Sequence, residues 1–316
     1  MSKPNPLKIV SLISSGTEIL CRLGLQANLV GISHECDYPE SIRHLPVLSE
    51  PRLDPKRRGS LINRELLETL NSGLSIYNIK TDLLESLAPD LIITQDQCEV
   101  CAVSLKDVER AVCHFTKKGT RVCTLTPHTL DNIHEDFMRV GEATGTQTAA
   151  AELITQFWIQ LNAVNAVAGT GIMKKPKVLC LEWLEPPMVA GGWIPEIVRL
   201  AGAEPVIVTD AAPFKTIDWE TALDSDPDVI AILPCGYPIE KTLNEMKDSA
   251  LSNILGKFRA TQAGNCFVCD GNNYFNRPGP RIADSCEIVA CLAHPEKFQH
   301  LVSRYIKTAY LSWRPQ

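Results

Sequence analysis

The chain has 316 residues, of which 45% are hydrophobic and 22% are charged. This composition is typical of a soluble globular protein of about two domains, and it excludes a disordered chain. With 31 Lys and Arg against 37 Asp and Glu, the net charge is −6, which argues against a nucleic acid or an anionic membrane as partner. No apolar run approaches the ~18 residues of a membrane helix, so we expect no membrane insertion.

The first residues of the sequence indicate a compartment. A short apolar run at residues 7–13 follows two prolines and precedes no small-residue cleavage site, whereas a secretory signal has a longer apolar core and such a site. We therefore interpret the run as the first strand and expect a protein of the reducing cytosol, that is, a cytoplasmic protein. There the 12 cysteines are thiols, metal ligands or redox groups and form no disulfide framework.

Strands and helices alternate in the first part of the chain. Near-continuous apolar runs, typical of buried parallel strands, occur at residues 8–13, 29–33, 91–94 and 121–125. Helical periodicity occurs between them at residues 17–23, 83–87 and 103–117. This alternation predicts an α/β domain with a parallel sheet.

The second half of the chain repeats the first. Residues 177–181 have the apolar pattern of residues 8–12, and residues 226–234 have the Pro-Asp and apolar pattern of residues 88–94. Further matches, in the same order along the chain, join 194–202 to 18–24, 205–208 to 29–33 and 263–270 to 118–124. Matches in one common order predict two similar α/β lobes.

The segment between the two halves has no strand signal. Its apolar residues, from Phe137 to Val164, recur near helical spacing, and a helix of about 20 residues rises roughly 30 Å. We therefore expect an N-terminal α/β lobe over residues 1–133, a connector helix over 134–170 and a C-terminal α/β lobe over 171–316.

Motifs in the N-terminal half are those of a known family. They are IVSLISSGTEIL at residues 9–20, LGL at 23–25, LVGIS at 29–33, CDYP at 36–39 and LAPDLIIT at 87–94. With these motifs and the connector segment, the sequence resembles the vitamin B12-binding periplasmic proteins, which are helical-backbone, class III substrate-binding proteins of ABC importers for corrinoids, iron-siderophores and haem. The resemblance covers about residues 7 to 300 and implies two lobes with central parallel sheets, joined by a single long connector helix.

Other motifs resemble a cytosolic branch of this family more closely, whose members are described as cobalamin-binding. They are SHECDYP at residues 33–39, TQDQCEVCAVS at 94–104, LEWLEPP at 181–187, PCGY at 234–237 and DGNNYFNRPGPR at 270–281. The sequence departs from the importer proteins because it shows no export signal and no lipid-attachment cysteine. A protein that stays in the cytosol cannot capture a ligand outside the membrane, so docking to an ABC importer is in doubt.

Polar and aromatic residues gather after the predicted strands. In a two-lobed parallel α/β protein, ligands bind beyond the carboxyl ends of the strands, and flat rings suit a large planar ligand such as a corrin or another tetrapyrrole. About half of these rings would equally suit the core, and Arg277 would either bind a carboxylate or phosphate of the ligand or tie down its own loop. The candidate ligand-binding residues are Ser15, Thr17, Glu18, Tyr38, Glu182, Trp183, Glu185, Trp193, Tyr237, Asn273, Tyr274 and Arg277.

Cys98 and Cys101 form the most specific motif, because these two cysteines, three residues apart, directly follow a predicted strand and begin a predicted helix. Such a pair grips one metal ion or forms a redox couple, or it packs in the core as two small apolar residues. With Cys36 and Cys235, which also follow strands, the pair would complete a four-cysteine metal site for zinc or an iron–sulfur cluster. His34 would replace one member of this set.

Cys266 and Cys269 have the same spacing but a different interpretation. They lie within a predicted strand, where residues three apart point to opposite faces and cannot readily chelate one ion. We interpret both as packing residues.

Two functions from different classes fit these features. The first is a cytosolic binding protein for a corrinoid-like or metal-containing cofactor, with cobalamin or a related corrinoid as its small-molecule ligand in the cleft between the lobes and His34 available as an axial ligand. The second is a cytosolic enzyme or redox protein on the same fold, with a cysteine-ligated zinc or iron–sulfur site. No Ser-His-Asp order, Walker loop, G-x-G-x-x-G or H-E-x-x-H is present, so the sequence names no reaction.

Overall fold

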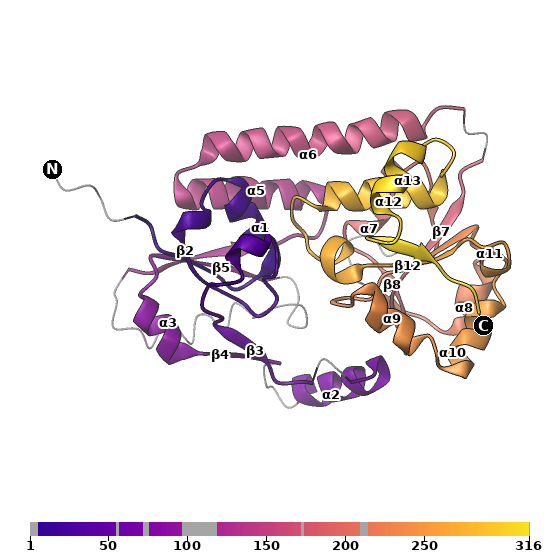
Figure 1. Ribbon diagram of the computed structural model, residues 1–316, viewed down its shortest axis with the longest axis horizontal. Coiled ribbons are helices and arrows are strands. Elements are labelled where there is room, and N and C mark those ends of the chain that lie inside the picture. Colours follow the sequence, from indigo (N-terminus) through magenta and orange to yellow (C-terminus); the bar gives the residue numbers. More distant parts are fainter. Residues whose placement is uncertain are drawn as a thin grey trace. The chain divides into compact units, whose positions relative to one another are not determined.

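A computed structural model describes residues 6–54, 57–71, 76–96, 119–171, 174–208 and 214–315 (Figure 1). The chain divides into two compact units. Unit 1 consists of Met1–Arg57, Leu61–Pro127 and Asp131–Thr155, and unit 2 consists of Arg58–Ser60, His128–Leu130 and Gln156–Gln316. The strands do not interleave, because those up to Leu125 belong to unit 1 and those from Lys177 onward belong to unit 2.

Unit 1 contains a parallel sheet with the strand order β2-β1-β5-β6. Its strands are β1 (Ile9–Ser11), β2 (Leu29–Ile32), β5 (Leu91–Gln95) and β6 (Arg121–Leu125), and a separate antiparallel pair is formed by β3 (Ser49–Pro51) and β4 (Tyr77–Ile79). The helices described before Pro127 are α1 (Ser14–Arg22), η1 (Gln26–Asn28), η2 (Glu40–Ile42), α2 (Gly59–Asn71) and α3 (Thr81–Leu87). The helix expected over residues 103–117 lies outside the described residues.

Both faces of the unit 1 sheet are covered, which is why its central strands read as apolar runs. On one face, Val10 and Ile92 pack with Leu84 of α3. On the other face, α1 approaches β5 so closely that a Cβ on Gly16 would lie 2.7 Å from a methyl group of Ile93. A glycine at this position therefore allows the helix to pack directly against the strand.

Two helices occupy the segment expected as the connector. They are α5 (Leu130–Thr144) and α6 (Gln147–Ala168), and the turn between them contains Gly145 with φ +76°, a left-handed conformation that favours glycine. The division between the units falls within α6, between Thr155 and Gln156.

Unit 2 contains a larger sheet with the strand order β10-β8-β7-β11-β12-β13, in which β9 also pairs with β7. The strands are β7 (Lys177–Leu184), β8 (Pro187–Ala190), β9 (Glu204–Pro205), β10 (Phe214–Thr216), β11 (Val229–Ile232), β12 (Cys266–Cys269) and β13 (Tyr310–Ser312). The parallel series β9-β7-β11-β12 has the same order as β2-β1-β5-β6, which confirms the repeat found in the sequence. The antiparallel strands β8, β10 and β13 are additions that the repeat did not predict.

Helices cover both faces of the unit 2 sheet (Figure 1). The helices are α7 (Ile194–Leu200), α8 (Trp219–Asp224), α9 (Ile239–Glu245), α10 (Ser249–Gly256), α11 (Arg259–Gln262), η3 (Gly271–Phe275), α12 (Ile282–Ala293) and α13 (Gln299–Tyr305). Cys266 and Val268 of β12 pack in the cluster formed with α8, α10 and α11, whereas Cys269 is buried but is not part of that cluster. This alternation along β12 agrees with the interpretation of Cys266 and Cys269 as packing residues on opposite faces.

Candidate functional site

In unit 2, an aromatic pair lies at the carboxyl ends of two adjacent parallel strands. Trp183 is near the end of β7 and Tyr237 follows β11, and their ring centroids are 5.1 Å apart at 63°. The sequence placed Glu182 and Trp183 after the strand, but β7 continues to Leu184 because it forms an antiparallel pair with β8. The half-buried indole of Trp183 donates a hydrogen bond to the carbonyl of Glu185 at 3.2 Å, which fixes the ring near this edge of the sheet.

Tyr237 is held from several sides. Its ring is 4% exposed, its hydroxyl donates to Glu245 Oε1 at 3.1 Å, and the ammonium of Lys241 lies 3.3 Å from the ring centroid. Burial and the Glu245 carboxylate raise the pKa of Tyr237 far above its usual value, so the phenol is neutral. Sequence reasoning missed Lys241 and Glu245, although both lie on the helix that begins just after Pro234-Cys-Gly-Tyr237, at a spacing of four residues.

The segment after β12 is a tightly bonded loop that contains η3. Asp270 accepts hydrogen bonds from the backbone N–H of Asn273 at 2.8 Å and from its side-chain amide at 2.7 Å. A Cβ on Gly271 would lie 2.1 Å from the carbonyl oxygen of Pro234, so only glycine lets this loop meet the end of β11 so closely. Arg277 is 5% exposed and donates a hydrogen bond to Asn272 Oδ1 at 3.0 Å within the same loop. This contact is of the kind expected if Arg277 ties down its own loop.

The other aromatic candidates differ in exposure. Trp193 is 8% exposed, and its indole N–H donates to the carbonyl of Phe275 at 3.0 Å, which joins the start of α7 to η3. Tyr274 in η3 is half-buried, and Tyr38 in unit 1 is 46% exposed. Tyr274 therefore offers a partly accessible ring near the carboxyl end of β12, whereas Trp193 supports the loop from within.

In unit 1, the candidate residues after β1 are buried in the first turns of α1. The sequence pattern predicted the start of this helix at residue 17, but the helix begins at Ser14 and has Ile13 as its N-cap, without the capping side chain that marks most helix starts. Ser15, Thr17 and Glu18 are at most 2% exposed, and Ser15 Oγ has no hydrogen-bond partner among the described residues.

Cys36 is a buried thiol in unit 1. It is 5% exposed, accepts a hydrogen bond from Thr17 Oγ1 at 3.0 Å and lies 3.3 Å from Ser33 Oγ. Burial raises the pKa of the Cys36 thiol, although the bonds with Ser33 and Thr17 lower it. Because metals bind the thiolate, this environment suits packing better than ligation.

The rest of the proposed four-cysteine set gains no support from the described chain. Cys98 and Cys101 lie outside the described residues. Cys235 is half-buried after β11 in unit 2, where its N–H donates to the carbonyl of Glu182 at 3.2 Å. Among the residues that the structure describes, no group of three or more His, Cys, Asp and Glu side chains could hold a metal ion.

His34 is a neutral imidazole after β2. Its Nδ1 lies 2.8 Å from Ser49 Oγ, its ring packs against Tyr77 at 5.2 Å between centroids, and its Nε2 is 4.0 Å from Glu35 Oε1. Burial lowers the pKa of His34 to about 4, so the ring is uncharged at neutral pH. A neutral imidazole with one nitrogen bonded to a neighbour is the form in which histidine ligates metals.

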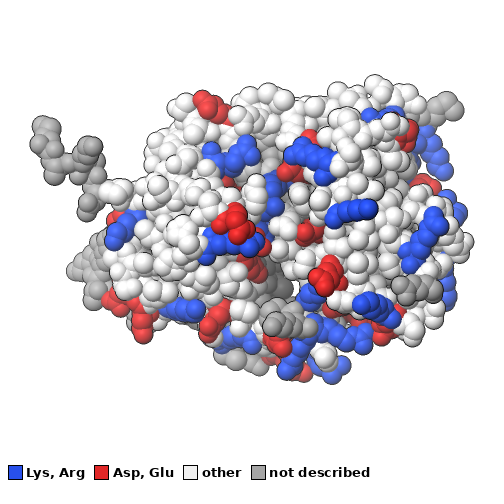
Figure 2. Space-filling model, viewed as in Figure 1, with Lys and Arg blue, Asp and Glu red and all other residues white. Residues whose placement is uncertain are grey.

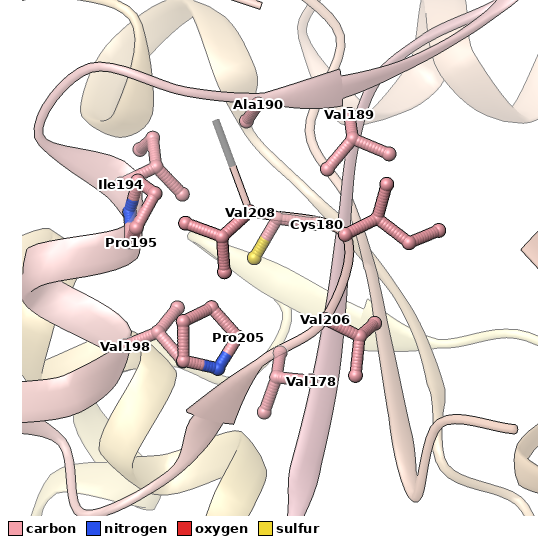
Figure 3. A pocket seen from close by; sticks show the side chains of 11 residues that line it. Val178, Cys180, Val189, Ala190, Ile194, Pro195, Val198, Pro205, Val206 and Val208 are labelled. Carbon is pink, nitrogen blue, oxygen red and sulfur yellow. The ribbon is translucent and has the colours of Figure 1, made fainter. Parts of the chain in front are cut away.

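A small apolar cavity lies where β7, β8 and β9 meet α7. Its lining includes Val178, Cys180, Val189 and Ile194, and its volume is about 10 Å³ (Figure 3). This is room for about one water molecule, and burial raises the pKa of the Cys180 thiol to about 12. The cavity is therefore a gap in packing and not a site for an organic ligand.

Charged side chains of both signs are interspersed over the surface in view in Figure 2, without a large area of one sign. Within the described parts of the chain, no helix combines the length and the apolar composition needed to cross a bilayer.

Comparisons with known proteins give the same family that the sequence motifs indicated. A family model described as Periplasmic binding protein matches residues 9–272. The chain is 21% identical over 303 residues to the uncharacterized ABC transporter substrate-binding lipoprotein YvrC of Bacillus subtilis. The matched region covers 94% of this chain and 83% of that protein. It is also 23% identical over 227 residues to the vitamin B12-binding protein of Vibrio campbellii, and this matched region covers 71% of this chain and 69% of the relative.

Solved structures share the fold. A periplasmic heme binding protein from Pseudomonas aeruginosa matches with a TM-score of 0.68 and 19% identity, over 92% of this chain and 93% of that chain. The periplasmic vitamin B12 binding protein BtuF of Vibrio cholerae matches with a TM-score of 0.65 and 18% identity, over 92% of this chain and 98% of that chain. These likenesses confirm the fold that the sequence resemblance implied.

The expectation of a cytosolic protein is wrong, because the matched relatives are a substrate-binding lipoprotein and periplasmic proteins. That expectation rested on interpreting the apolar run at residues 7–13 as a strand, and the run does contain β1 (Ile9–Ser11). The first strand of a domain looks the same in exported and retained proteins, so it carries no information about the compartment.

Proposed function

Since the chain belongs to the periplasmic binding protein family, we propose that it is a substrate-binding protein whose ligand is a tetrapyrrole, either a corrinoid or haem. Relatives named as vitamin B12-binding and heme binding support this ligand class. The doubt about docking to an ABC importer rested on cytosolic residence and falls with it, so delivery to an importer is part of the proposal.

The observation that carries the proposal is the Trp183–Tyr237 pair. The two rings lie 5.1 Å apart at the carboxyl ends of adjacent parallel strands, which is the edge of an α/β sheet where ligands bind. Tyr237 is 4% exposed and is fixed by Glu245 and Lys241, so it supports the half-buried ring of Trp183 from within. Trp183 therefore presents a rigid aromatic surface at low entropic cost. Such a surface suits a broad planar macrocycle.

For unit 1 taken by itself, we propose separately that His34 is able to ligate the cobalt or iron of a corrinoid or haem. Its neutral ring and its bond to Ser49 support this role, because a fixed, uncharged imidazole is the usual nitrogen ligand of such metals. No observation among the described residues favours the enzyme or redox alternative, whose central pair, Cys98 and Cys101, lies outside them.

Titration with cyanocobalamin, aquocobalamin and haemin tests the ligand class. All five tryptophans lie in unit 2, at positions 158, 183, 193, 219 and 313, so quenching of their fluorescence reports binding. We expect saturable binding of at least one probe, and a loss of about tenfold in affinity, ~1.4 kcal/mol, for Trp183→Leu. Trp158→Leu is the matched control, because Trp158 lies on α6 and packs against Phe157.

The absorbance spectrum tests His34 separately. If it ligates the metal, His34→Ala shifts the bands of bound haemin or aquocobalamin, while binding of cyanocobalamin, whose axial positions are filled, changes little. Absence of saturable binding for all three probes would overturn the ligand class. Unaltered spectra with His34→Ala would overturn only the assignment of His34.

A further inference from the structure

Tyr274 is the partly accessible ring of the loop after β12, and its ring is oriented by two neighbours. It packs edge-on against Tyr305, with 6.3 Å between centroids and an interplanar angle of 88°. The guanidinium of Arg281 lies 5.7 Å from the centre of the same ring. Edge-to-face packing and cation–π contact both depend on ring angle, so the orientation of Tyr274 follows that of Tyr305.

Tyr305 on α13 is itself anchored. Its ring is 2% exposed, and its hydroxyl donates to Glu287 Oε2 at 2.5 Å and faces Asp284 Oδ1 at 3.4 Å. The guanidinium of Arg304 lies 5.0 Å from the centre of the ring. Hydrogen bonds to a carboxylate are among the stronger ones in proteins, so the phenol has one preferred angle.

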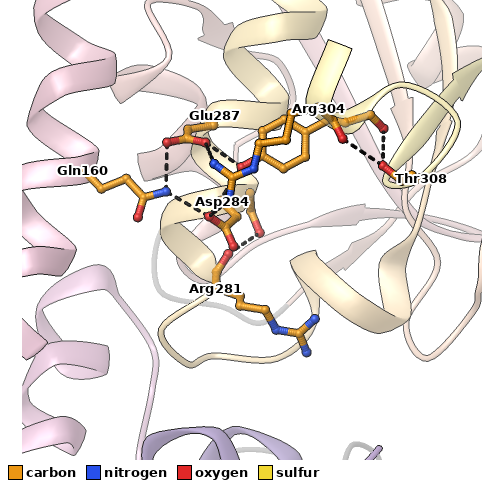
Figure 4. Close-up of polar contacts among 8 residues, drawn as sticks. Gln160, Arg281, Asp284, Glu287, Arg304 and Thr308 are labelled. Carbon is orange, nitrogen blue, oxygen red and sulfur yellow. Dashed lines mark hydrogen bonds and ion pairs between the residues drawn. The ribbon is translucent and has the colours of Figure 1, made fainter. Parts of the chain in front are cut away.

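The two carboxylates are in turn fixed by α6. The side-chain amide of Gln160 donates to Asp284 Oδ1 and to Glu287 Oε1, each at 2.9 Å (Figure 4). Arg304 adds an ion pair with Glu287 at 3.5 Å. Glu287 therefore keeps two partners if the phenol is removed, which means that the hydroxyl of Tyr305 is not needed to satisfy the acid.

We propose that Tyr305 is a positioning residue: the hydrogen bond that it donates to Glu287 sets the angle at which the Tyr274 ring meets the ligand. This inference rests on the proposed function for the ligand, but the ring geometry on which it depends lies wholly within unit 2. The contacts form a chain from Gln160 through Glu287 and Tyr305 to Tyr274. Residues that support a binding ring from behind in this way commonly control how well it binds.

The test is a double-mutant cycle measured with haemin and cyanocobalamin. Tyr305→Phe keeps the ring but removes the hydroxyl, and we expect it to weaken binding roughly threefold to tenfold. In a Tyr274→Ala background the same change should have less than about a twofold effect, because the ring that it positions is absent. Tyr310→Phe is the matched control, since Tyr310 is 4% exposed on β13 and packs on Phe267.

A second measurement needs no ligand. In protein labelled with ¹³C-tyrosine, the ring signals of Tyr274 are assigned by their loss in Tyr274→Phe. We expect Tyr305→Phe to shift or broaden them, and Tyr310→Phe to leave them in place. Melting temperatures of all variants separate a loss of stability from a change in ring position.

Two results would overturn the inference. One is an equal loss of affinity from Tyr305→Phe with Tyr274 present and absent, and the other is an unchanged Tyr274 ring signal. If the unaltered chain binds none of haemin, cyanocobalamin and aquocobalamin, the proposed function fails, and the ring signal alone decides whether Tyr305 positions Tyr274.

Discussion

Both carboxylate oxygens of Asp136 accept a hydrogen bond from the backbone N–H of Thr126, at 3.2 and 3.0 Å. Asp136 lies on α5 and is fully buried, and Thr126 directly follows β6. Arg139, one turn further along α5, pairs with the same carboxylate. The contact fastens α5 to the carboxyl end of β6 in unit 1.

This carboxyl group makes the stability of unit 1 depend on pH. Burial raises the pKa of Asp136 to about 7 from 3.8, against the lowering effects of the Thr126 N–H and of Arg139. The folded state therefore holds the proton more tightly than the unfolded state, so this contribution to stability is complete below about pH 4 and is lost as the pH rises to about 7. Asp136→Asn should remove this part of the pH dependence.

Urea unfolding at several pH values, followed by far-ultraviolet circular dichroism, measures the effect. Circular dichroism is needed because the tryptophans all lie in unit 2. Asp131→Asn is the control, since the side chain of Asp131 is 75% exposed on the same helix. Parallel pH profiles for the unaltered chain and Asp136→Asn would contradict the prediction.

His34 should act on stability in the opposite direction. Burial lowers the pKa of His34 to about 4 from 6.5, so the unfolded state binds the proton more readily. The resulting stability is present above about pH 6.5 and is lost as the pH falls towards 4. His34→Gln should reduce this loss of stability at acid pH. The NMR signal of the His34 imidazole, assigned by its absence in His34→Gln, should not titrate between about pH 5.5 and 8. A titration midpoint near 6.5 would show that the ring is not buried in this way.

Gly271→Ala should displace the loop that holds Tyr274. The added Cβ would lie 2.1 Å from the carbonyl oxygen of Pro234, a backbone atom that cannot rotate away, and such overpacking costs about 1–3 kcal/mol. Gly236→Ala is the comparison, because Gly236 has φ +70° but open space around its Cβ position, so only backbone strain of about 1 kcal/mol is expected. Tryptophan fluorescence during urea unfolding measures both, and equal losses would refute the steric argument.

Alkylation should separate the described cysteines by burial. Cys235 is half-buried, whereas Cys36, Cys180 and Cys266 are buried thiols whose pKa values burial raises. In native protein treated briefly with iodoacetamide, peptide mapping by mass spectrometry should find Cys235 modified first and the other three only after denaturation.

Cys36→Ser should leave the metal content of the purified protein unchanged. Loss of bound zinc or iron in this variant would revive the cysteine-ligated site.

Sequence patterns predicted the repeated parallel strands well because buried strands need apolar runs, as in Ile9–Ser11 and Val229–Ile232. They failed where neighbours decide the outcome. Strand β7 extends through Glu182 and Trp183 because β8 pairs with it, and α1 begins at Ser14 without a capping side chain. Neither feature leaves a local signal.

The candidate site was only partly accessible to the same reasoning. Trp183 and Tyr237 were found because they follow the pattern of aromatics at strand ends, and the structure brings their rings together. The residues behind these rings were missed: Glu245, which holds Tyr237, and Tyr305, which orients Tyr274. Tyr305 lies 31 residues after Tyr274 in the printed sequence, so no spacing rule connects the two rings.

The separation of the strands along the chain bears on synthesis. Every described pair in the β2-β1-β5-β6 sheet is available once Leu125 has emerged from the ribosome, before β7 has been translated. The parallel sheet of unit 1, whose edge strands are β2 and β6, therefore needs no strand from the second half of the chain. The larger sheet lacks this advantage at its last edge, since β13 (Tyr310–Ser312) pairs with β12 only when translation is nearly complete.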